Sequence, residues 1–169
     1  QEAPRMKEDF TRVDFGWWGF FGVSTQADLF EYGTSRAAAW DCPATMQADL
    51  EAFRANPRFD DVFEVLRRWE DVRATNWLTQ EQKTQLQNLQ QEHILLINEA
   101  GSYELVPYRQ INCKCERICA FVFTRANKNY VVFWHKTGKG LLRLPFTGEY
   151  TLETELGKAD IQAIGKGNE

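Results

Sequence analysis

The sequence changes its hydrophobic period once, and this change limits the folds that the chain can adopt. From Arg12 to about Gln91, short apolar runs alternate with segments in which apolar residues recur every three or four positions, as in amphipathic helices. From about His93 onward, apolar residues recur at every second position, which is typical of half-buried strands. We therefore expect a βαβα segment over residues 1–91 and an antiparallel β-domain over residues 92–169.

Two strands and four helices are expected in the first segment. Apolar runs at 12–21 ("RVDFGWWGFF") and 38–47 ("AAWDCPATMQ") predict the strands. The glycines of the first run indicate close approach by another backbone or by a ligand. Helical spacing and capping residues predict helices over residues 24–39, 47–57, 58–78 and 79–93.

Capping residues mark two of the expected helix starts. Ser24 or Thr25 can cap the helix over 24–39 through its hydroxyl group. Thr79 is followed three positions later by Gln82, which is the spacing of a capping box. The helix that follows Thr79 is polar, so we expect it to lie at the surface.

The second segment is predicted to consist of strands joined by tight turns. The runs with a period of two lie at 93–99, 103–111, 117–125, 129–136, 141–146 and 150–156. Asn and Gly in "ANKN" and "TGKG" predict hairpin turns, because both residues tolerate positive φ. The run "NYVVFWH" at 129–135 is apolar on both faces, which predicts a central, covered strand.

Composition and charge exclude several classes of protein. Hydrophobic residues make up 43% of the chain and charged residues 26%, which predicts a packed core. The net charge of −4 argues against a nucleic-acid partner, because such proteins normally present a basic face. No apolar run approaches the roughly eighteen residues of a membrane span. The start "QEAPRMKEDF" is no signal peptide, and it leaves open whether a leader or a longer protein precedes Gln1.

Several stretches resemble the C-terminal part of TIM-barrel glycoside hydrolase-like proteins of polysaccharide-degrading bacteria. They are "DFGWWGFFG", "TQADLFEYGTSRAAAWDCPATMQADLEAF", "FEVLRRWEDVR", "LTQEQKTQLQNLQQEHILLINEAGSYELVPY" and "AFVFTRANKNYVVFWHKTGKGLLRLPF". The resemblance covers nearly the whole chain and concerns texture and order, without a signature motif. It implies that residues 1–91 are the last two βα units of a barrel and that residues 92–169 form an antiparallel β-sandwich.

The resemblance also implies partners and a location. A polysaccharide or oligosaccharide would be the ligand, no cofactor would be needed, and the protein would be secreted or periplasmic. A (β/α)₈ barrel takes roughly 250 residues and eight strands, whereas this segment offers two strands. We therefore expect a fragment that is inactive alone, and whose partner is the missing N-terminal part of the same protein or a second copy. If the chain is complete, it must instead be a smaller α+β fold.

Residues near the carboxyl ends of the two expected strands are the candidates for binding a sugar, because barrel chemistry sits at these ends. Trp17 and Trp18 lie near the end of the first strand, and Gln47 ends the second. Adjacent strand residues face opposite ways, so only one of the two tryptophans can line the ligand face. The alternative is that one tryptophan belongs to the core and the other packs on a helix.

Acidic residues are candidates because glycoside hydrolysis needs two carboxylates flanking the scissile bond. Asp14, Asp28, Glu31 and Asp41 lie close to strand ends in the first segment. Asp14 and Asp41 fall inside apolar runs, where a structural ion pair with an arginine is the alternative to a substrate contact. The catalytic acids of such barrels usually come from earlier strands, so no catalytic pair is named. Asp28, Glu31 and Asp41 are expected to bind substrate.

Cysteines in "CKCERIC" raise the question of a metal or a disulfide. Cys113, Cys115 and Cys119 would share one face of an unbroken strand, which suits a core better than a tetrahedral zinc site. We expect no metal, and a disulfide from Cys113 or Cys115 to a neighbouring strand stays open.

Three functions compete on these observations. The first is part of a carbohydrate-active enzyme, to which the chain contributes aromatic side chains of the substrate site and a supporting β-domain. The second is a non-catalytic module that binds carbohydrate or protein. The third is a redox or metal protein built on "CKCERIC".

Overall fold

The computed structural model of the protein describes residues 17–111, 116–144 and 151–152, and of Trp17 and Trp18 it describes the backbone alone. The elements of the first half are β1 (Trp17–Phe20), α2 (Ala27–Ala39), β2 (Ala44–Gln47), α3 (Leu50–Ala55), α4 (Phe59–Ala74) and α5 (Gln80–Gln87). Those of the second half are β3 (Glu92–Ile97), β4 (Tyr103–Gln110), β5 (Ile118–Arg125) and β6 (Lys128–His135).

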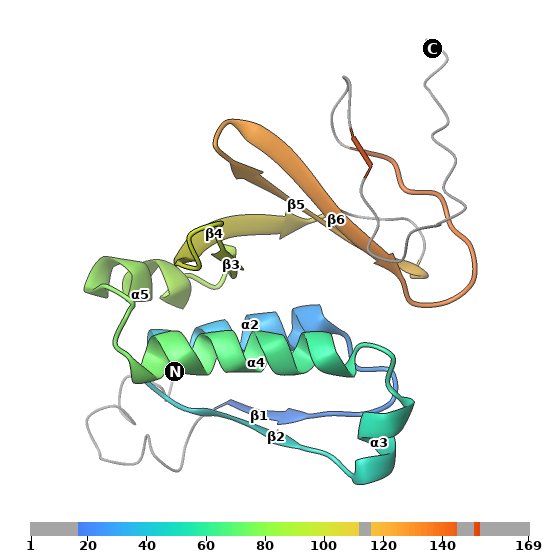
Figure 1. The fold of residues 1–169 in the computed structure, drawn as a ribbon, viewed down its shortest axis with the longest axis horizontal. Helices are drawn as coiled ribbons and strands as arrows, with labels where there is room; N and C mark the ends of the chain where they lie inside the picture. Colours follow the sequence, from blue (N-terminus) through green and yellow to red (C-terminus); the bar gives the residue numbers. More distant parts are fainter. Residues whose placement is uncertain (1–16, 112–115, 145–150, 153–169) are drawn as a thin grey trace.

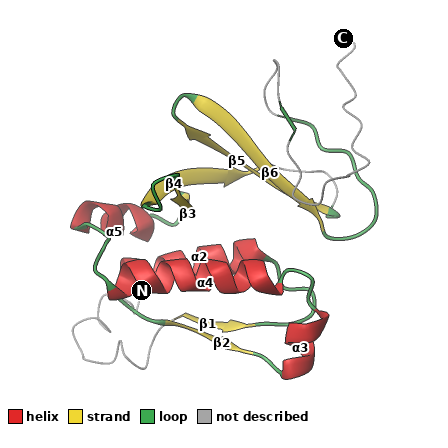
Figure 2. Ribbon diagram, viewed as in Figure 1, coloured by secondary structure: helices red, strands yellow, loops and turns green. Residues whose placement is uncertain are grey.

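These elements form three layers (Figure 1), with the paired strands β1 and β2 on one side of the helices α2 and α4 and the sheet of β3 to β6 on the other. The mixed α/β class expected from the change of period is therefore confirmed. The helices alternate with strands in the first half only, as Figure 2 shows by colour. Within the described residues, no helix is both long enough and apolar enough to cross a membrane.

The strands β1 and β2 run parallel, with Trp17 opposite Ala44 and Phe20 opposite Gln47. The buried cluster that holds this pair to the helices consists of Phe21, Phe30, Ala52 and Val62. Phe53 and Phe59 pack against this cluster, and their tilted or edge-on ring contacts with each other, with Phe21 and with Phe63 have centroids 4.4–6.0 Å apart. The parallel pair is thus attached to the helical layer by a dense aromatic contact.

The start of α2 differs from the expectation that Ser24 or Thr25 caps it. The N-cap residue is Gln26, and its side chain makes no capping hydrogen bond. The Thr25 hydroxyl instead accepts a hydrogen bond from the Gly22 backbone N–H at 2.9 Å. This bond closes the turn between β1 and α2, so the Thr25 hydroxyl accepts a turn N–H and does not cap the helix.

A second buried cluster joins the helices to the antiparallel sheet. It consists of Ala38, Ala39, Trp69, Val72, Leu78, Leu86 and Leu95, from α2, α4, α5 and β3 and from the loop before α5. The start of α5 is the expected capping box, with Thr79 and Gln82 each bonding the other's backbone N–H. The helix over 79–93 is shorter than expected and ends at Gln87, because the chain enters β3 at Glu92.

The strands β3 to β6 form an antiparallel sheet in the order β3-β4-β5-β6. Each strand pairs with the next one along the chain, so four of the expected strands are confirmed as a meander. Residues 141–144, expected to be part of a fifth strand, have no regular structure. The expected strand over 150–156 falls almost entirely outside the described residues.

The strand β6 is not the central strand that its sequence predicts. In the described part of the chain it is the outer strand of the sheet, and Tyr130 and Val132 are 41% and 49% exposed. On one face Val131 and Phe133 pack against the buried cluster of β5, while on the other face Trp134 is the partly buried residue. An apolar pattern on both faces therefore arises here in a strand that, among the described residues, has one hydrogen-bonded neighbour.

The opposite outer strand, β3, lies against the helical layer. The Arg68 side chain of α4 donates a hydrogen bond to the Leu95 backbone carbonyl at 3.2 Å. An unpaired strand edge exposes backbone donors and acceptors that favour pairing with other chains. Here a helix side chain satisfies one of those groups, so the helices close the edge of the sheet at Leu95.

Candidate functional site

The carboxyl ends of β1 and β2 lie side by side, as the sequence predicts for a parallel pair. The Phe21 backbone N–H donates to the Gln47 carbonyl at 2.9 Å, which extends the pairing just beyond the last strand residues. Phe20 is 69% exposed and Gln47 is also exposed. This strand end therefore presents an aromatic ring and an amide at directly paired positions.

The tryptophans occupy the beginning of β1 and not its carboxyl end. Trp17 and Trp18 are paired with Ala44 and Thr45, and the strand continues to Phe20. The expected position of the strand end near the tryptophans is thus wrong, because parallel pairing persists until the turn at Gly22. Their side chains lie outside the description, and their contact with a sugar stays a prediction.

Asp41 does not lie at the carboxyl end of β2, where Gln47 is. It precedes the strand in the loop after α2, where its φ is +58°, a conformation that aspartate tolerates better than most residues. Its carboxylate pairs with Lys83 of α5 at 2.5 Å. The structural ion pair considered for this residue is therefore present, although with a lysine.

Asp28 and Glu31 lie on the face of α2 that is turned toward the antiparallel sheet. The electrostatic neighbours of Asp28 are Lys136 and Glu92, both from the β-domain. Glu31 is hydrogen-bonded to Trp69 of α4. The three acids predicted for the site are thus in two different places, and neither place is the carboxyl end of β1 and β2.

Glu31 makes the most enclosed acidic contact of this region. Its carboxylate accepts a hydrogen bond from the Trp69 indole N–H at 2.7 Å. Loss of hydration in this environment raises the pKa of Glu31 to about 7, against the opposing effects of the Trp69 bond, the Leu95 backbone and the Arg68 cation. Glu31 as a whole residue is partly buried.

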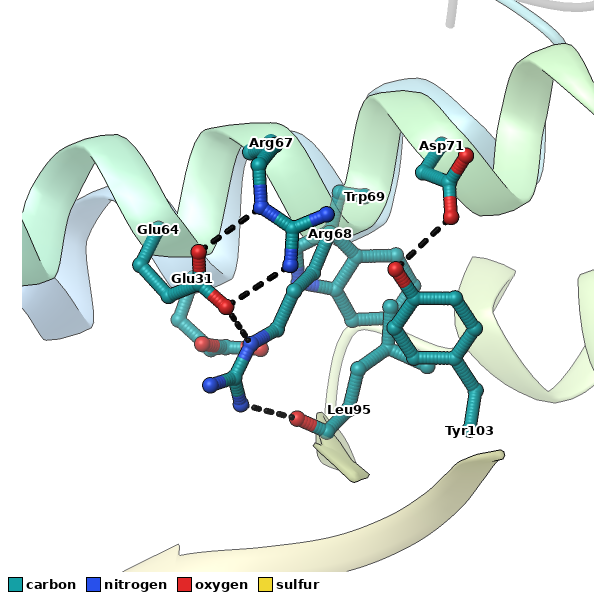
Figure 3. A network of polar contacts seen from close by, with 8 residues as sticks. All are labelled: Glu31, Glu64, Arg67, Arg68, Trp69, Asp71, Leu95 and Tyr103. Carbon is teal, nitrogen blue, oxygen red and sulfur yellow. Dashed lines mark hydrogen bonds and ion pairs between the residues drawn. The ribbon is translucent and has the colours of Figure 1, made fainter. Parts of the chain in front are cut away.

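The cations nearest to Glu31 are engaged elsewhere, as Figure 3 shows. Glu64 of α4 accepts hydrogen bonds from Arg67 at 2.8 Å and from Arg68 at 2.7 Å. These two bonds lower the pKa of Glu64 to about 2. The second end of the Arg68 guanidinium is turned toward the Leu95 carbonyl. Arg68 therefore bridges Glu64 and β3, and affects Glu31 only through its charge.

A second acidic contact connects β3 and β4 next to α2. The Tyr108 hydroxyl donates to the Glu92 carboxylate at 2.6 Å. Burial and the charges of Glu92, Glu31 and Asp28 raise the pKa of Tyr108. The Oδ1 atom of Asp28 is enclosed without a hydrogen-bond partner, and burial raises the pKa of this carboxyl group. The helix–sheet junction is thus rich in acids that are partly removed from water.

A cavity of about 440 Å³ lies where the end of α5 and the loop after it meet β3 and β4. Its lining consists of Gln85, Asn88, Gln91, His93, Leu105 and Pro107. His93 is 6% exposed, and its Nδ1 atom has no hydrogen-bond partner. Burial and the Arg36 cation lower the pKa of His93, which favours the neutral ring. Because Nδ1 is itself enclosed, it does not face the open part of this cavity.

Arg36 of α2 holds the loop that forms one wall of the cavity. Its guanidinium donates to the backbone carbonyls of Leu86 and Asn88, and to that of Gln91 at 3.0 Å. A cation at these carbonyls suits the C-terminal end of α5, where unpaired carbonyl groups concentrate negative partial charge. The role of Arg36 in this loop is therefore to fix the path between α5 and β3.

The structure describes only part of the cysteine motif "CKCERIC". No group of three or more His, Cys, Asp or Glu side chains in the described part of the chain is arranged to hold a metal ion. Cys42 and Cys119 are buried, whereas Cys113 and Cys115 lie outside the described residues. The disulfide considered for those two cysteines stays open.

The sequence did not predict that Trp69, Glu92, His93 and Tyr108 lie together at the junction. A hydrogen-bond acceptor near Trp69 could have been predicted, because a tryptophan within the apolar stripe of a helix needs an acceptor for its indole N–H. The other three lie in strands whose neighbours could not be identified from the spacing.

Comparison with protein-family models, with curated proteins and with solved structures gave no match for this chain.

Proposed function

We propose that this chain is the terminal part of a carbohydrate-active, glycosidase-like protein. Its β1 and β2 would be the last strands of a larger barrel-type parallel sheet. The proposal is supported by the order of elements, in which two parallel strands alternate with helices and an antiparallel sheet follows. In barrels of this kind the helices cover the outside of the strands, and ligands bind at the carboxyl ends of the strands.

The observation that carries the proposal is the pair formed by Phe20 and Gln47. They are direct partners at the carboxyl end of the parallel pair, and both are exposed. An aromatic ring can stack on the apolar C–H face of a sugar, and a neighbouring amide can hydrogen-bond its hydroxyl groups. Trp18 occupies the alternate position of β1 before Phe20, so both positions belong to one face of the strand.

The parallel pair also favours a larger sheet. Parallel strands are normally covered on both faces, and two strands alone are marginally stable in water. We propose that further strands come from another part of the same protein or from a second copy. The antiparallel sheet, with or without additional strands that would make it a sandwich, then supports the helical layer from outside. A secreted or periplasmic location suits a protein that meets polysaccharides.

The proposal is tested by affinity electrophoresis of the chain through gels that contain soluble xylan, β-glucan, arabinan or mannan. We expect retardation by at least one polysaccharide, and we expect Phe20→Ala or Gln47→Ala to weaken it about tenfold, the effect of losing one good contact. Tyr130→Ala is the matched control, because it removes an exposed aromatic ring from β6. Binding that is equal in all variants, or absent from every gel, would reject the site.

The alternative of a non-catalytic binding module is separated by hydrolysis assays. The chain alone is expected to release no reducing sugar, because the residues named for the site do not include a pair of flanking carboxylates. Reducing sugar released by the longer protein that contains this chain would favour the enzyme. Binding without hydrolysis in that longer protein would favour the module.

A further inference from the structure

The Glu31 carboxyl group is the point at which α2, α4 and β3 meet. It projects from α2, accepts the Trp69 indole N–H of α4 at 2.7 Å, and interacts with the Leu95 backbone of β3. Next to it, Arg68 donates to the Leu95 carbonyl. Leu95, on the edge of β3, is therefore contacted from two helices (Figure 3).

No cation is dedicated to this carboxyl group. Within the described part of the chain, no lysine or arginine forms an ion pair with Glu31, and the nearby Arg68 is paired with Glu64 at 2.7 Å. Its hydrogen-bond donors are neutral, an indole and a backbone amide. An enclosed carboxylate with neutral donors alone loses more hydration energy than it regains.

The charged and titratable groups on the surrounding elements do not compensate for this loss. Asp28 lies on the same face of α2, Glu92 lies on β3, and the neutral Tyr108 hydroxyl lies on β4. His93 on β3 is held near its neutral form beside Arg36. Lys136, a cation of the β-domain, acts on Asp28. Among the described residues, the charge that acts most directly on Glu31 is the Arg68 cation, and burial outweighs it, so a proton on Glu31 is favoured.

We propose that Glu31 is a proton-responsive latch between the two parts of the chain, which closes the junction of α2, α4 and β3 when it is protonated and loosens it when ionised. The protonated group still accepts the Trp69 N–H through its carbonyl oxygen. The ionised group gains from hydration, and it meets more water when β3 moves away from the helices at Leu95. The latch would thereby couple pH to the docking of the antiparallel sheet.

The direction of this coupling distinguishes the latch from an ordinary salt bridge. Burial raises the pKa of Glu31 to about 7 from its unperturbed value of 4.5, so the folded chain binds this proton more tightly than the unfolded chain. The stabilisation is complete below the unfolded value and is lost as the pH rises toward 7. A carboxylate held by a cation would behave in the opposite way, because its stabilisation is lost on acidification.

Glu31→Gln is the decisive variant, because glutamine reproduces the neutral side chain and keeps an acceptor for the Trp69 N–H. Hydrogen exchange of the Leu95 amide, corrected for the intrinsic pH dependence, reports opening of the junction. In the unmodified chain we expect protection at Leu95 to fall at least about tenfold between about pH 5.5 and about pH 8.5. In Glu31→Gln we expect high protection that does not change with pH.

A second readout keeps the proposal testable if the variant lowers overall stability. The Trp69 indole N–H resonance of the unmodified chain, assigned by its loss in Trp69→Phe, should titrate with a midpoint near neutrality. Asp28→Asn and His93→Gln are the controls, and both should retain this titration. Protection at Leu95 that is independent of pH, or that decreases on acidification, would overturn the proposal. A titration of Trp69 that persists in Glu31→Gln would also overturn it.

Discussion

The indole N–H of Trp69 donates a 2.7 Å hydrogen bond to the Glu31 carboxylate, across 38 positions of the sequence. Trp69 is 1% exposed, so its N–H has no access to bulk water. The bond therefore satisfies the buried indole N–H, and it fixes how α2 and α4 lie against each other next to β3.

Replacing Trp69 by phenylalanine should weaken this contact severely. The substitution removes the donor, leaves the Glu31 carboxyl group poorly satisfied, and opens a small cavity in the cluster around Leu95. We expect the free energy of unfolding, measured by urea denaturation near pH 6, to fall by about 2–4 kcal/mol.

Trp77→Phe is the matched control, because Trp77 packs against the same cluster while partly buried. It should lower the free energy of unfolding by less than about 1.5 kcal/mol. Equal losses in the two variants would show that ring volume, and not the bond to Glu31, accounts for the effect of Trp69→Phe.

Arg68 and Arg67 share the Glu64 carboxylate but should differ in importance. Arg68 also donates to the Leu95 carbonyl on the outer edge of β3, whereas Arg67 is the more exposed of the two. We expect Arg68→Met to lower the free energy of unfolding by about 1–2 kcal/mol, because a backbone carbonyl loses its donor.

Arg67→Met serves as the control and should change stability by less than about 0.5 kcal/mol, as is usual for a surface ion pair. Hydrogen exchange adds a local readout, since Arg68→Met should also increase exchange in β3. A variant pair with indistinguishable exchange in β3 would argue against closure of this edge by Arg68.

Thr79 should be the most sensitive position of the otherwise polar helix α5. Its hydroxyl accepts from the Gln82 backbone N–H at 3.2 Å, and the Gln82 side chain accepts from the Thr79 backbone N–H at 2.8 Å. We expect Thr79→Ala to lower the midpoint of urea denaturation by an amount corresponding to about 1 kcal/mol. Thr84→Ala, an exposed change within the same helix, should have a smaller effect; the reverse order would contradict the capping role.

The capping box and the change of period show what a single sequence can predict. Both are local patterns, since Thr79 and Gln82 are three positions apart and the meander pairs each strand with the next one. The helix over 58–78 was equally accessible, because its apolar stripe extends over several turns of α4. Local periodicity thus predicted the helices, most of the strands and the mixed α/β class.

The position of an element within its sheet could not be predicted in the same way. The run that forms β6 is apolar on both faces, yet it is the outer strand among the described residues. On one face its residues pack against the buried cluster of β5, and on the other face Tyr130 stacks on Phe123, also of β5, with centroids 5.2 Å apart. The apolar residues of both faces are therefore explained by neighbours that only the folded chain brings together.

The environment of the predicted site residues was also beyond local patterns. Glu31 and Asp41 were selected for their proximity to strand ends, but their partners, Trp69 and Lys83, come from α4 and α5. Burial and charge at such contacts depend on pairs that are about forty positions apart. The sequence predicted that these acids need partners, and the fold determines which partners they have.

His93 provides a last prediction, in which the pH dependence has the opposite sign to that of Glu31. Burial and the Arg36 cation lower the pKa of His93 below its unperturbed value of 6.5, so the unfolded chain binds this proton more readily than the folded chain. The stabilisation is present above about pH 6.5 and is lost as the pH falls through the lowered pKa. His93→Gln should therefore reduce the loss of stability on acidification, measured by urea denaturation between about pH 7 and about pH 5. His135→Gln, at the exposed end of β6, is the control and should leave that loss unchanged.

In the same experiment Glu31→Gln should remove a gain of stability on acidification, so the two variants should displace the pH profile in opposite directions. Displacement in the same direction would show that one of the two buried groups has been assigned the wrong charge state.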